Sequence, residues 1–386
     1  MDETTVLQGL MARKLPTWAA AGLVCPHRLA LEQCSGERTA SYKGEVAARL
    51  FPNGGERMAD LTGGLGVDFS ILARHFAHAL YVERQGVLCE TARRNFERLG
   101  LTQAEVTEGD GREVLRGMPH TDLIYMDPAR RDSAGRKTVR IGDCEPDVKA
   151  LLPLLWEKTD CVLLKLSPML DLTLAARELG CVAEAHIVGD GGECKELLLV
   201  LRPDAGRYDI VCADGTHRFR FRPEEEEAAV AEMADDTGRY LYEPSAALLK
   251  AGAFKLTAAR YGLRKLHPNT HLYTADHLVD GFPGRCFEIK GVTGFGKRAL
   301  RDLCRSVEER ANLTVRNFPG TVADLRKRLK LREGGDAYWF ATTLADGRHV
   351  LIDCRKPELH ARGDETSGKE APPHDGTTEA GTPYII

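Results

Sequence analysis

Short apolar runs alternate with amphipathic stretches through the first half of the chain. After an opening run that ends near Met58, the next runs are residues 79–83, 104–107, 122–126 and 161–166. Each run is as short as a buried strand. Between residues 83 and 100, apolar side chains recur at helical spacing, and Gly100 is a typical residue just after a helix C-terminus. Strands that alternate with helices in this way predict a doubly wound α/β domain.

The first of these strands leads into a turn that is rich in glycine. Residues 58–68 read Met-Ala-Asp-Leu-Thr-Gly-Gly-Leu-Gly-Val-Asp, and a helix that places Phe69, Leu72, Ala73 and Phe76 on one face is expected to follow. Glycine lets a backbone approach a ligand that any Cβ would push away. The turn therefore indicates a nucleotide-cofactor site, although glycine turns of this kind also serve packing alone.

Four acids follow four successive strand ends. They are Asp60, Glu83, Asp110 and Asp127. Glu83 lies roughly 20 residues beyond the glycine turn, where a nucleotide-binding α/β unit places an acid for the ribose hydroxyls. The spacing makes Glu83 the candidate for ribose binding. A dehydrogenase remains an alternative for the turn alone, but the Asp127-Pro128 pair has no use in such an enzyme.

Composition places the chain among ordinary globular proteins. It has 386 residues, of which 43% are hydrophobic and 28% charged, enough for two or three domains. No apolar stretch reaches the ~18 residues of a membrane helix, and the Met-Asp-Glu-Thr-Thr start is unlike a signal peptide. The 11 cysteines include no Cys-x-x-Cys pair. We therefore expect a cytoplasmic protein with reduced thiols, no structural metal, no membrane contact and no obligate protein partner.

The charge is unevenly distributed. The whole chain carries −4, whereas residues 245–332 hold 18 Lys and Arg against 7 Asp and Glu. A local excess of this size is typical of a module that binds a phosphate backbone. A solvated helix face with no ligand is the alternative.

The basic region contains a predicted helix and hairpin. Thr321 and Asp324 form the cap of a short helix, and a hairpin follows over residues 337–344 and 350–353. The helix is expected to point four basic side chains outward: Arg326, Lys327, Arg328 and Lys330. Residues 338–340 are Tyr, Trp and Phe, and we expect at least one of them in the core and another free to stack.

The motifs resemble those of class I S-adenosylmethionine-dependent methyltransferases. The resemblance rests on Asp-Leu-Thr-Gly-Gly-Leu-Gly at 60–66, on Glu83, on Asp110, and on Asp-Pro-Ala-Arg at 127–130. The first motif is most similar to that of ribosomal RNA guanine-N2 methyltransferases. Nearly the whole chain, including residues 325–331 and 338–344, resembles a bacterial group of methyltransferases with a THUMP-like domain, whose substrate the resemblance does not supply.

The resemblance implies a role for each motif residue. Asp60 would help to fix the methionine end of the cofactor, Glu83 would bind the ribose hydroxyls and Asp110 the adenine amine. Asp127 and Pro128 would face the methyl group. Three residues belong to the turn itself: Gly64 and Gly66 match the second and third glycines of the family pattern, and Thr62 replaces the first.

The acceptor is predicted from the Asp127-Pro128 pair. The Asp127 carboxylate and the Pro128 carbonyl can accept the two hydrogens of an exocyclic amine and so aim its lone pair at the methyl group. Arg130 stands where amine-methylating relatives carry an aromatic residue, and Arg131 follows it; both fit a base or a phosphate. Uracil-C5 chemistry is not expected, because Ser167 stands where its nucleophilic cysteine would be.

A second glycine-rich stretch needs a separate interpretation. Residues 291–298 nearly match the phosphate-binding loop of an NTPase, but Arg298 stands where a magnesium ligand should be, so nucleotide hydrolysis is not expected. Lys297 and Arg298 can instead contact an RNA phosphate at a helix N-terminus. A tight turn in a ferredoxin-like unit is the alternative.

The resemblance also predicts that the last two strands of the sheet, residues 185–188 and 197–201, form an antiparallel pair with a long turn-rich connection. Lys195 and Glu196 are expected to be ordinary charges at the sheet edge.

These observations predict a Rossmann-like α/β methyltransferase sheet with an N-terminal helical segment and small C-terminal α+β modules. The expected divisions are a helical segment 1–50, a methyltransferase domain 51–205, connecting hairpin and helices 206–269, a ferredoxin-like module 270–315, a THUMP-like basic module 316–357 and a disordered tail 358–386. The predicted activity is transfer of a methyl group from S-adenosylmethionine to a nitrogen of an RNA base, in rRNA or tRNA. A protein or small-molecule methyltransferase and an inactive RNA-binding protein are the alternatives.

Overall fold

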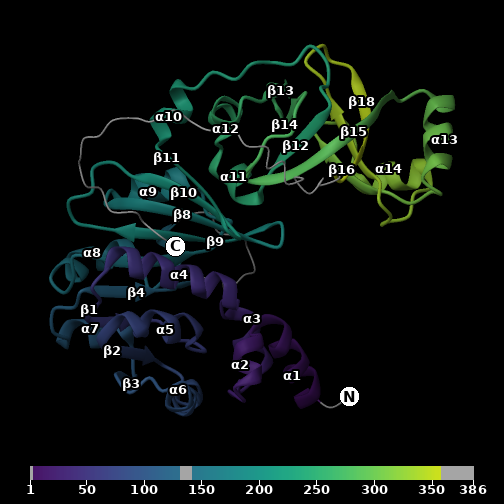
Figure 1. Ribbon diagram of the computed structural model, residues 1–386. Coiled ribbons are helices and arrows are strands. Elements are labelled where there is room, and N and C mark those ends of the chain that lie inside the picture. The colour runs from purple at the N-terminus through teal and green to yellow at the C-terminus, as the bar shows by residue number, and fades with distance from the viewer. Residues whose placement is uncertain (1–2, 131–140, 358–386) are drawn as a thin grey trace, which may run out of the picture.

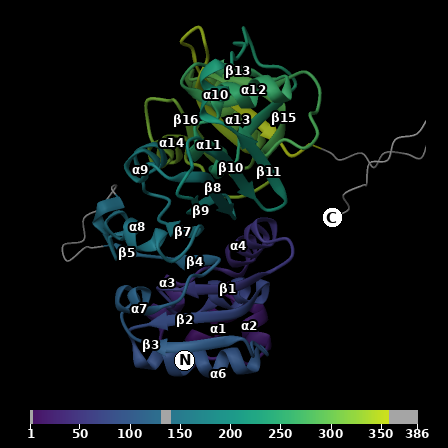
Figure 2. The same cartoon turned by 90° about the vertical axis from the view of Figure 1, so that its left-hand side faces the viewer.

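The computed structural model describes residues 3–130 and 141–357, and two β-sheets organise them (Figure 1). The larger sheet lies in residues 55–221 and the smaller in residues 240–355. In Figures 1 and 2 the helices of the N-terminus lie beside the larger sheet, and the two sheets stand next to each other.

The larger sheet has nine strands in the order β11-β10-β8-β9-β7-β4-β1-β2-β3. Their bounds are β1 (Gly55–Asp60), β2 (Phe76–Glu83), β3 (Ala104–Glu108), β4 (Leu123–Met126), β7 (Val162–Leu166), β8 (Val182–Asp190), β9 (Glu193–Leu201), β10 (Asp209–Asp214) and β11 (His217–Phe221). The five strands β1, β2, β3, β4 and β7 are parallel, and β9 runs antiparallel to both β7 and β8. This arrangement confirms the predicted α/β class, and the sheet continues past residue 205 into β10 and β11.

Helices cover both faces of this sheet. The helical elements in the first half of the chain are α1 (Glu3–Lys14), α2 (Pro16–Ala20), α3 (Arg28–Gln33), α4 (Glu37–Leu50), α5 (Val67–Leu72), η1 (Ala73–His75), α6 (Gly86–Arg98), α7 (Gly111–Gly117), η2 (Ile141–Asp143), α8 (Val148–Trp156) and α9 (Leu172–Leu179). Two short strands, β5 (Ala129–Arg130) and β6 (Cys144–Glu145), pair with each other in a separate small sheet. Apolar side chains of α4, α5 and α6 form the core on one face, and those of α7, α8 and α9 form it on the other. Doubly wound domains bury a parallel sheet in this way because each face is apolar.

The helix after the glycine turn is shorter than its apolar pattern predicted. It ends at Leu72, a 3₁₀ turn follows, and Phe76 is the first residue of β2. Phe76 still packs in the same cluster as Phe69 and Leu72. The apolar spacing therefore predicted correctly which side chains are buried, but it predicted the end of the helix incorrectly. A strand can bury the next apolar residue equally well.

The antiparallel pair β8–β9 is confirmed, but its connection is not the long one expected. Only Gly191 and Gly192 separate the strands, with φ angles of 63° and 81° that favour glycine. The ladder therefore includes residues expected in the loop, among them Glu196. The side chain of Glu196 is buried, with 2% of the residue exposed, so the prediction of an edge charge was wrong.

The second sheet has seven strands in the order β13-β14-β12-β15-β18-β17-β16. Its strands are β12 (Tyr240–Pro244), β13 (Arg264–His267), β14 (Thr270–Ala275), β15 (Gly284–Gly294), β16 (Asn312–Arg316), β17 (Tyr338–Thr343) and β18 (His349–Arg355), with helices α10 (Pro223–Ala228), α11 (Ala246–Ala251), α12 (Phe254–Tyr261), α13 (Lys297–Ser306) and α14 (Val322–Leu329). The predicted 337–353 hairpin is confirmed as β17–β18. Residues 291–294 pair with β18 inside β15, so this segment forms a strand and not a phosphate-binding loop.

Two of the three aromatic residues of β17 lie in the core. Trp339 is 0% exposed and Phe340 1% exposed, and they belong to different core clusters because both faces of the sheet are covered. Tyr338 is half-buried and its ring packs 4.9 Å from that of Phe287. The expectation of at least one core residue is therefore confirmed, and Tyr338 is the only one of the three that stays partly exposed.

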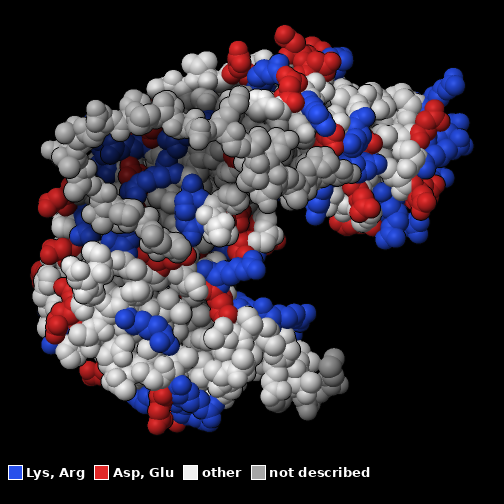
Figure 3. Space-filling view, viewed as in Figure 1, with Lys and Arg blue, Asp and Glu red and all other residues white. Residues whose placement is uncertain are grey.

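The two sheets meet through α11, which packs on β8, β9 and β10. Lys250 at the end of α11 donates a 2.8 Å hydrogen bond to the carbonyl of Leu170. Figure 3 shows that the molecule is hollowed between the N-terminal helices and the C-terminal sheet. Within the described ranges, no helix is long and apolar enough to cross a membrane.

Candidate active site

Two adjoining cavities open at the carboxyl ends of the parallel strands. Their volumes are about 220 and 660 Å³, and both are lined by Thr62, Glu83 and Asp127. Every residue predicted for cofactor binding or catalysis in the methyltransferase domain lines one or both cavities: Asp60, Thr62, Gly64, Gly66, Glu83, Asp110, Asp127 and Pro128. The strand order brings these residues together, because parallel strands end at a common edge.

The glycines of the turn serve different purposes. Gly64 and Gly66 have φ angles of 61° and 82°, in the left-handed region that favours glycine. A Cβ on Gly64 would have no protein atom closer than 3.8 Å, so this backbone is open to the cavity. A Cβ on Gly63 would instead lie 2.5 Å from the ring of Tyr81, so Gly63 is required for packing. The open backbone at Gly64 is what a ligand cradle requires.

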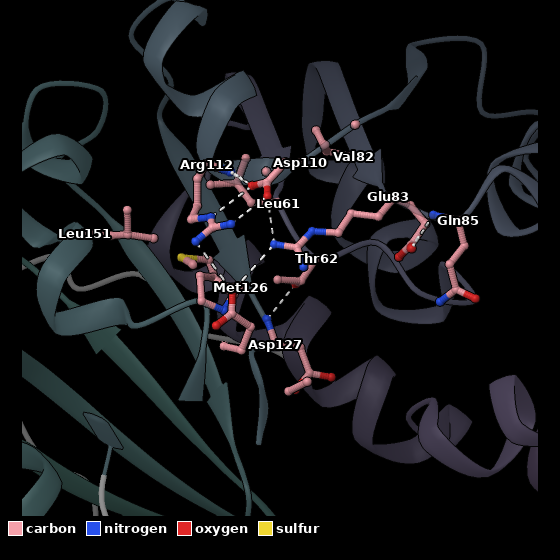
Figure 4. Close-up of a pocket in the computed structure, with 16 residues that line it drawn as sticks. Leu61, Thr62, Val82, Glu83, Gln85, Asp110, Arg112, Met126, Asp127 and Leu151 are labelled. Carbon is pink, nitrogen blue, oxygen red and sulfur yellow. Dashed lines mark hydrogen bonds and ion pairs between the residues drawn. The ribbon is translucent and has the colours of Figure 1, made fainter. Parts of the chain in front are cut away.

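Glu83 is fixed at the edge of the glycine turn. Its Oε2 accepts a hydrogen bond from the N–H of Gly64 at 2.9 Å, and its Oε1 accepts one from the N–H of Gln85 at 2.9 Å. The carboxylate therefore lies across both cavities in a set orientation (Figure 4). A carboxylate has about four acceptor sites, so each oxygen keeps capacity for a ligand hydroxyl.

Thr62 links the ends of two strands. Its backbone N–H and its hydroxyl donate to Oδ1 of Asp60 at 2.9 and 3.1 Å. The same hydroxyl accepts a hydrogen bond from the N–H of Asp127 at 2.7 Å (Figure 4). The threonine that replaces the first glycine therefore holds β1 and β4 at a fixed separation.

Asp60 is buried below the turn, with 1% of the residue exposed. Burial raises the pKa of Asp60 to about 8, although the hydrogen bonds from Thr62 lower it. The carboxyl group is therefore largely protonated at neutral pH, and a nearby cation would favour its ionised form.

Two arginines hold Asp110. Oδ1 accepts from the backbone N–H and Nε of Arg112 at 2.8 and 3.2 Å, and Oδ2 accepts from Arg112 and Arg84 at 2.9 Å each. The hydrogen bonds from Arg112 hold the pKa of Asp110 well below its usual range. Arg84 and Arg112 were not predicted from the sequence. The contact of Arg112 with Asp110 could have been predicted from its position two residues after Asp110, at the start of α7.

Asp127 forms an ion pair that the sequence analysis missed. Its Oδ2 contacts Nζ of Lys165, which comes from β7 and is 12% exposed. Burial alone would lower the pKa of Lys165, but the carboxylates of Asp127, Asp68 and Glu196 raise it above its usual value. The lysine is therefore charged. In the sequence, Lys165 stands out as the single lysine inside an otherwise apolar strand.

A buried ionic cluster continues from Lys165 along the wall of the larger cavity, which Asp68 and Glu196 also line. Nζ of Lys43 is fully buried and lies 3.1 Å from Oδ1 of Asp68 and 2.6 Å from Oε1 of Glu196. The other oxygen of Asp68 accepts hydrogen bonds from Tyr125 and Ser35 at 2.7 Å each. Although burial favours the neutral acid, these neighbours lower the pKa of Asp68 to about 2. The cluster ties the N-terminal helices to the base of the site.

The N-terminal segment also forms a wall of the larger cavity. His27, Leu29, Ala30 and Gln33 of α3 or its cap line it, and Leu29 is 57% exposed. Because α3 stands opposite the strand ends, this segment bounds the space available to an acceptor. The predicted RNA contacts of Arg130 and Arg131 cannot be placed there, because the Arg130 side chain and all of Arg131 lie outside the described residues.

The basic residues predicted to bind RNA gather on α13 and α14. Lys297 and Arg298 are exposed in the first turn of α13, and Lys327, Arg328 and Lys330 are exposed on or just after α14. Arg326 does not point outward as predicted: its side chain is 20% exposed and lies 3.6 Å from Glu333. One of its guanidinium nitrogens is buried.

Comparisons with known proteins agree with this arrangement. A "putative methyltransferase" from Porphyromonas gingivalis W83, whose crystal structure is known, is 39% identical and superposes with a TM-score of 0.83, covering 92% of this chain and 90% of that one. The chain belongs to the S-adenosylmethionine-dependent methyltransferases with C-terminal ferredoxin-like and THUMP-like domains. The predicted family and enzyme class are thereby confirmed.

A second relative matches most of this methyltransferase, and two family models match its C-terminal part. An "uncharacterized S-adenosylmethionine-dependent methyltransferase" from Mycobacterium tuberculosis is 27% identical over 345 residues, which are 86% of this chain and 88% of that one. Family models for a ferredoxin-like domain and for a THUMP domain-like unit match residues 240–283 and 284–356. Both ranges begin earlier than the modules expected from the sequence, and together they cover the whole second sheet.

Proposed function

We propose that this methyltransferase transfers the methyl group of S-adenosylmethionine to a nitrogen of an RNA base, in rRNA or tRNA. The observation that carries the proposal is the position of Asp127 and Pro128, which line the larger cavity together with the glycine turn. The basic C-terminal module supports the choice of RNA.

The residues around the cavities fit the cofactor. Gly64 presents open backbone, and Glu83 has free acceptor capacity for two ribose hydroxyls. Asp60 would contact the methionine end, where the cationic amino group would favour its ionised form. Asp110 lines the smaller cavity, and it would accept a hydrogen bond from the adenine amine in exchange for one of the four that it now accepts from Arg84 and Arg112.

The proposed mechanism depends mainly on positioning. The bound cofactor supplies a methyl group that its sulfonium makes electrophilic. Lys165 holds Oδ2 of Asp127, which would leave Oδ1 to accept one hydrogen of an amine while the Pro128 carbonyl accepts the other. These contacts would direct the nitrogen lone pair toward the methyl group. The proton that the amine releases can pass to Asp127 or to solvent.

The C-terminal module supports an RNA substrate through charge and family. Residues 245–332 carry an excess of 11 positive charges, and the exposed basic residues on α13 and α14 or next to them include five of those predicted to bind RNA. The match to a THUMP domain-like family, residues 284–356, includes α13 and α14. Phosphate contacts of this kind position a nucleic acid without reading its sequence.

Transfer of a labelled methyl group tests the proposal. Total RNA from cells that lack this protein would be incubated with labelled S-adenosylmethionine and the enzyme, with Asp127→Ala as control and cellular protein as a parallel acceptor. We expect label in RNA with the intact enzyme only, and nuclease mapping would then locate the site. Label in protein or in small molecules alone would overturn the proposal.

A catalytically inactive RNA-binding protein gives a different result in the same experiment. Such a protein would bind the cofactor and RNA with ordinary affinity and label no acceptor. Calorimetric titration with S-adenosylmethionine, carried out beside the transfer assay, separates this outcome from a misfolded preparation.

A further inference from the structure

The C-terminal module contains a small aromatic cavity that the methyl-transfer site does not use. Its volume is about 260 Å³, and its lining includes Phe295, Phe318, Leu325, Arg328 and His349. It lies between the start of α13, the loop before α14 and the start of β18. The cavity therefore belongs entirely to the THUMP-like unit.

The aromatic rings form an open stacking surface. The rings of Phe295 and Phe318 have centroids 4.7 Å apart and planes inclined by 32°, and His349 packs edge-on against Phe318 at 5.4 Å. Phe295 and Phe318 are only half-buried, and His349 is exposed. Aromatic side chains that remain partly exposed around a cavity are suited to a flat, apolar ligand group.

Basic side chains flank this aromatic surface, and the one carboxylate in the lining, that of Asp324, accepts hydrogen bonds from Thr321 in the cap of α14. The guanidinium of Arg328 lies 5.7 Å from the centre of the Phe295 ring. Lys297 and Arg298 follow Phe295 in the first turn of α13, whose N-terminus no side chain caps. Figure 3 shows several Lys and Arg side chains, with Asp and Glu side chains between them, at the end of the molecule that carries α13. A ligand that matches this site is flat and apolar in one part and anionic in the next.

We infer that this cavity holds an unpaired base of a single-stranded RNA segment, with the adjoining phosphates on Lys297, Arg298 and Arg328. The inference rests on the proposed RNA substrate. A base in a duplex has both faces covered by its neighbours, whereas an unpaired base can stack on Phe318 and Phe295. Aromatic stacking tolerates any base, so the cavity would retain single-stranded RNA without reading its sequence.

Binding of short labelled oligonucleotides to the full-length protein tests the inference, with fluorescence anisotropy as the readout. The probes are a single-stranded RNA and the same ribose-phosphate chain without bases. We expect Phe318→Ala to weaken binding of the first probe about tenfold and to leave binding of the abasic probe unchanged. Phe318→Trp should retain affinity, because it preserves the stacking face.

Two further variants separate loss of the stacking surface from a general effect of the substitution on folding. His349→Ala removes an exposed ring and should weaken binding of the base-carrying probe several-fold. Leu278→Ala changes a partly exposed apolar residue before the opposite end of β15, and it should bind both probes as the unaltered protein does.

Equal losses on both probes, or no loss with any variant, would overturn the base-binding cavity and leave methyl transfer to RNA standing. Absence of binding to either probe by folded protein would also overturn it. The methyl-transfer assay with total RNA decides the proposed function separately, because it does not depend on these variants.

Discussion

The hydroxyl of Thr62 accepts a hydrogen bond from the backbone N–H of Asp127 at 2.7 Å while it donates to Asp60. One side chain thus joins the glycine turn after β1 to the turn that carries the proposed catalytic carboxylate after β4. Glycine at this position would supply no such bond. The departure from the family pattern at Thr62 is therefore a structural element of the site.

Removing this hydroxyl should weaken cofactor binding. In Thr62→Val, valine has nearly the same volume as threonine, but it leaves the N–H of Asp127 without a hydrogen-bond acceptor. An unsatisfied buried donor costs about 1–3 kcal/mol. We expect the Kd for S-adenosylmethionine, measured by calorimetry, to rise about tenfold. Thr62→Ser keeps the hydroxyl and should bind as the unaltered protein does. Equal affinity for the valine variant would show that the bond does not shape the cofactor site.

Lys165 should affect the transfer rate more than cofactor binding. Lys165→Met removes the contact that orients Asp127, and a small misplacement of a reacting group costs about 100-fold in rate. We expect a loss of that size in methyl transfer to RNA. The Kd for S-adenosylmethionine serves as control and should change far less. A rate near that of the unaltered enzyme would exclude a positioning role for Lys165.

Lys43 should be important for stability. Its ammonium group is fully buried between Asp68 and Glu196, and removing one partner of a buried ionic cluster costs about 3–5 kcal/mol. Lys43→Met should lower the free energy of unfolding in urea by about that amount, whereas Lys149→Met on the exposed face of α8 should not. Addition of Glu196→Gln to Lys43→Met should recover part of the loss, because it removes an unpaired charge.

Asp60 should make stability depend on pH. Its pKa of about 8 in the folded protein lies above the usual 3.8, so between these values the folded protein holds a proton that the unfolded chain has released. Asp60 therefore makes its full contribution to the free energy of unfolding below about pH 4. The contribution is lost as the pH rises toward 8, by up to about 1.4 kcal/mol per pH unit. Asp60→Asn should flatten the pH dependence of unfolding over this window. An unchanged slope would contradict the raised pKa.

The basic helices should determine how RNA binding responds to salt. Replacing Lys297, Arg298 and Lys327 by Gln removes three exposed charges, and each phosphate contact to a single strand contributes about 0.7 to the slope of log K against log salt. We expect weaker binding and a smaller slope, measured by anisotropy over a range of salt concentrations. The control replaces three exposed basic residues of the methyltransferase domain by Gln: Arg116, Lys149 and Arg177. It should leave the slope of log K against log salt unchanged.

Local pattern and strand direction were sufficient to predict much of the site. Apolar runs located the strands because a buried strand needs consecutive apolar residues, and the acids after those runs were Asp60, Glu83, Asp110 and Asp127. Since parallel strands end at one edge, a correct list of strands already implied that these acids meet. The family and the fold class followed from the same motifs.

Contacts between distant segments were decided only by the tertiary structure. Lys43, Asp68 and Glu196 come from α4, α5 and β9, and nothing local to any of them indicates the others. Burial of Trp339 on one face and Phe340 on the other depended on what covers each face of the second sheet. Sequence pattern thus determined which segments form strands and helices and which acids follow the strands. Tertiary packing decided the ion pairs and the exposed rings, because both depend on neighbours that are remote along the chain.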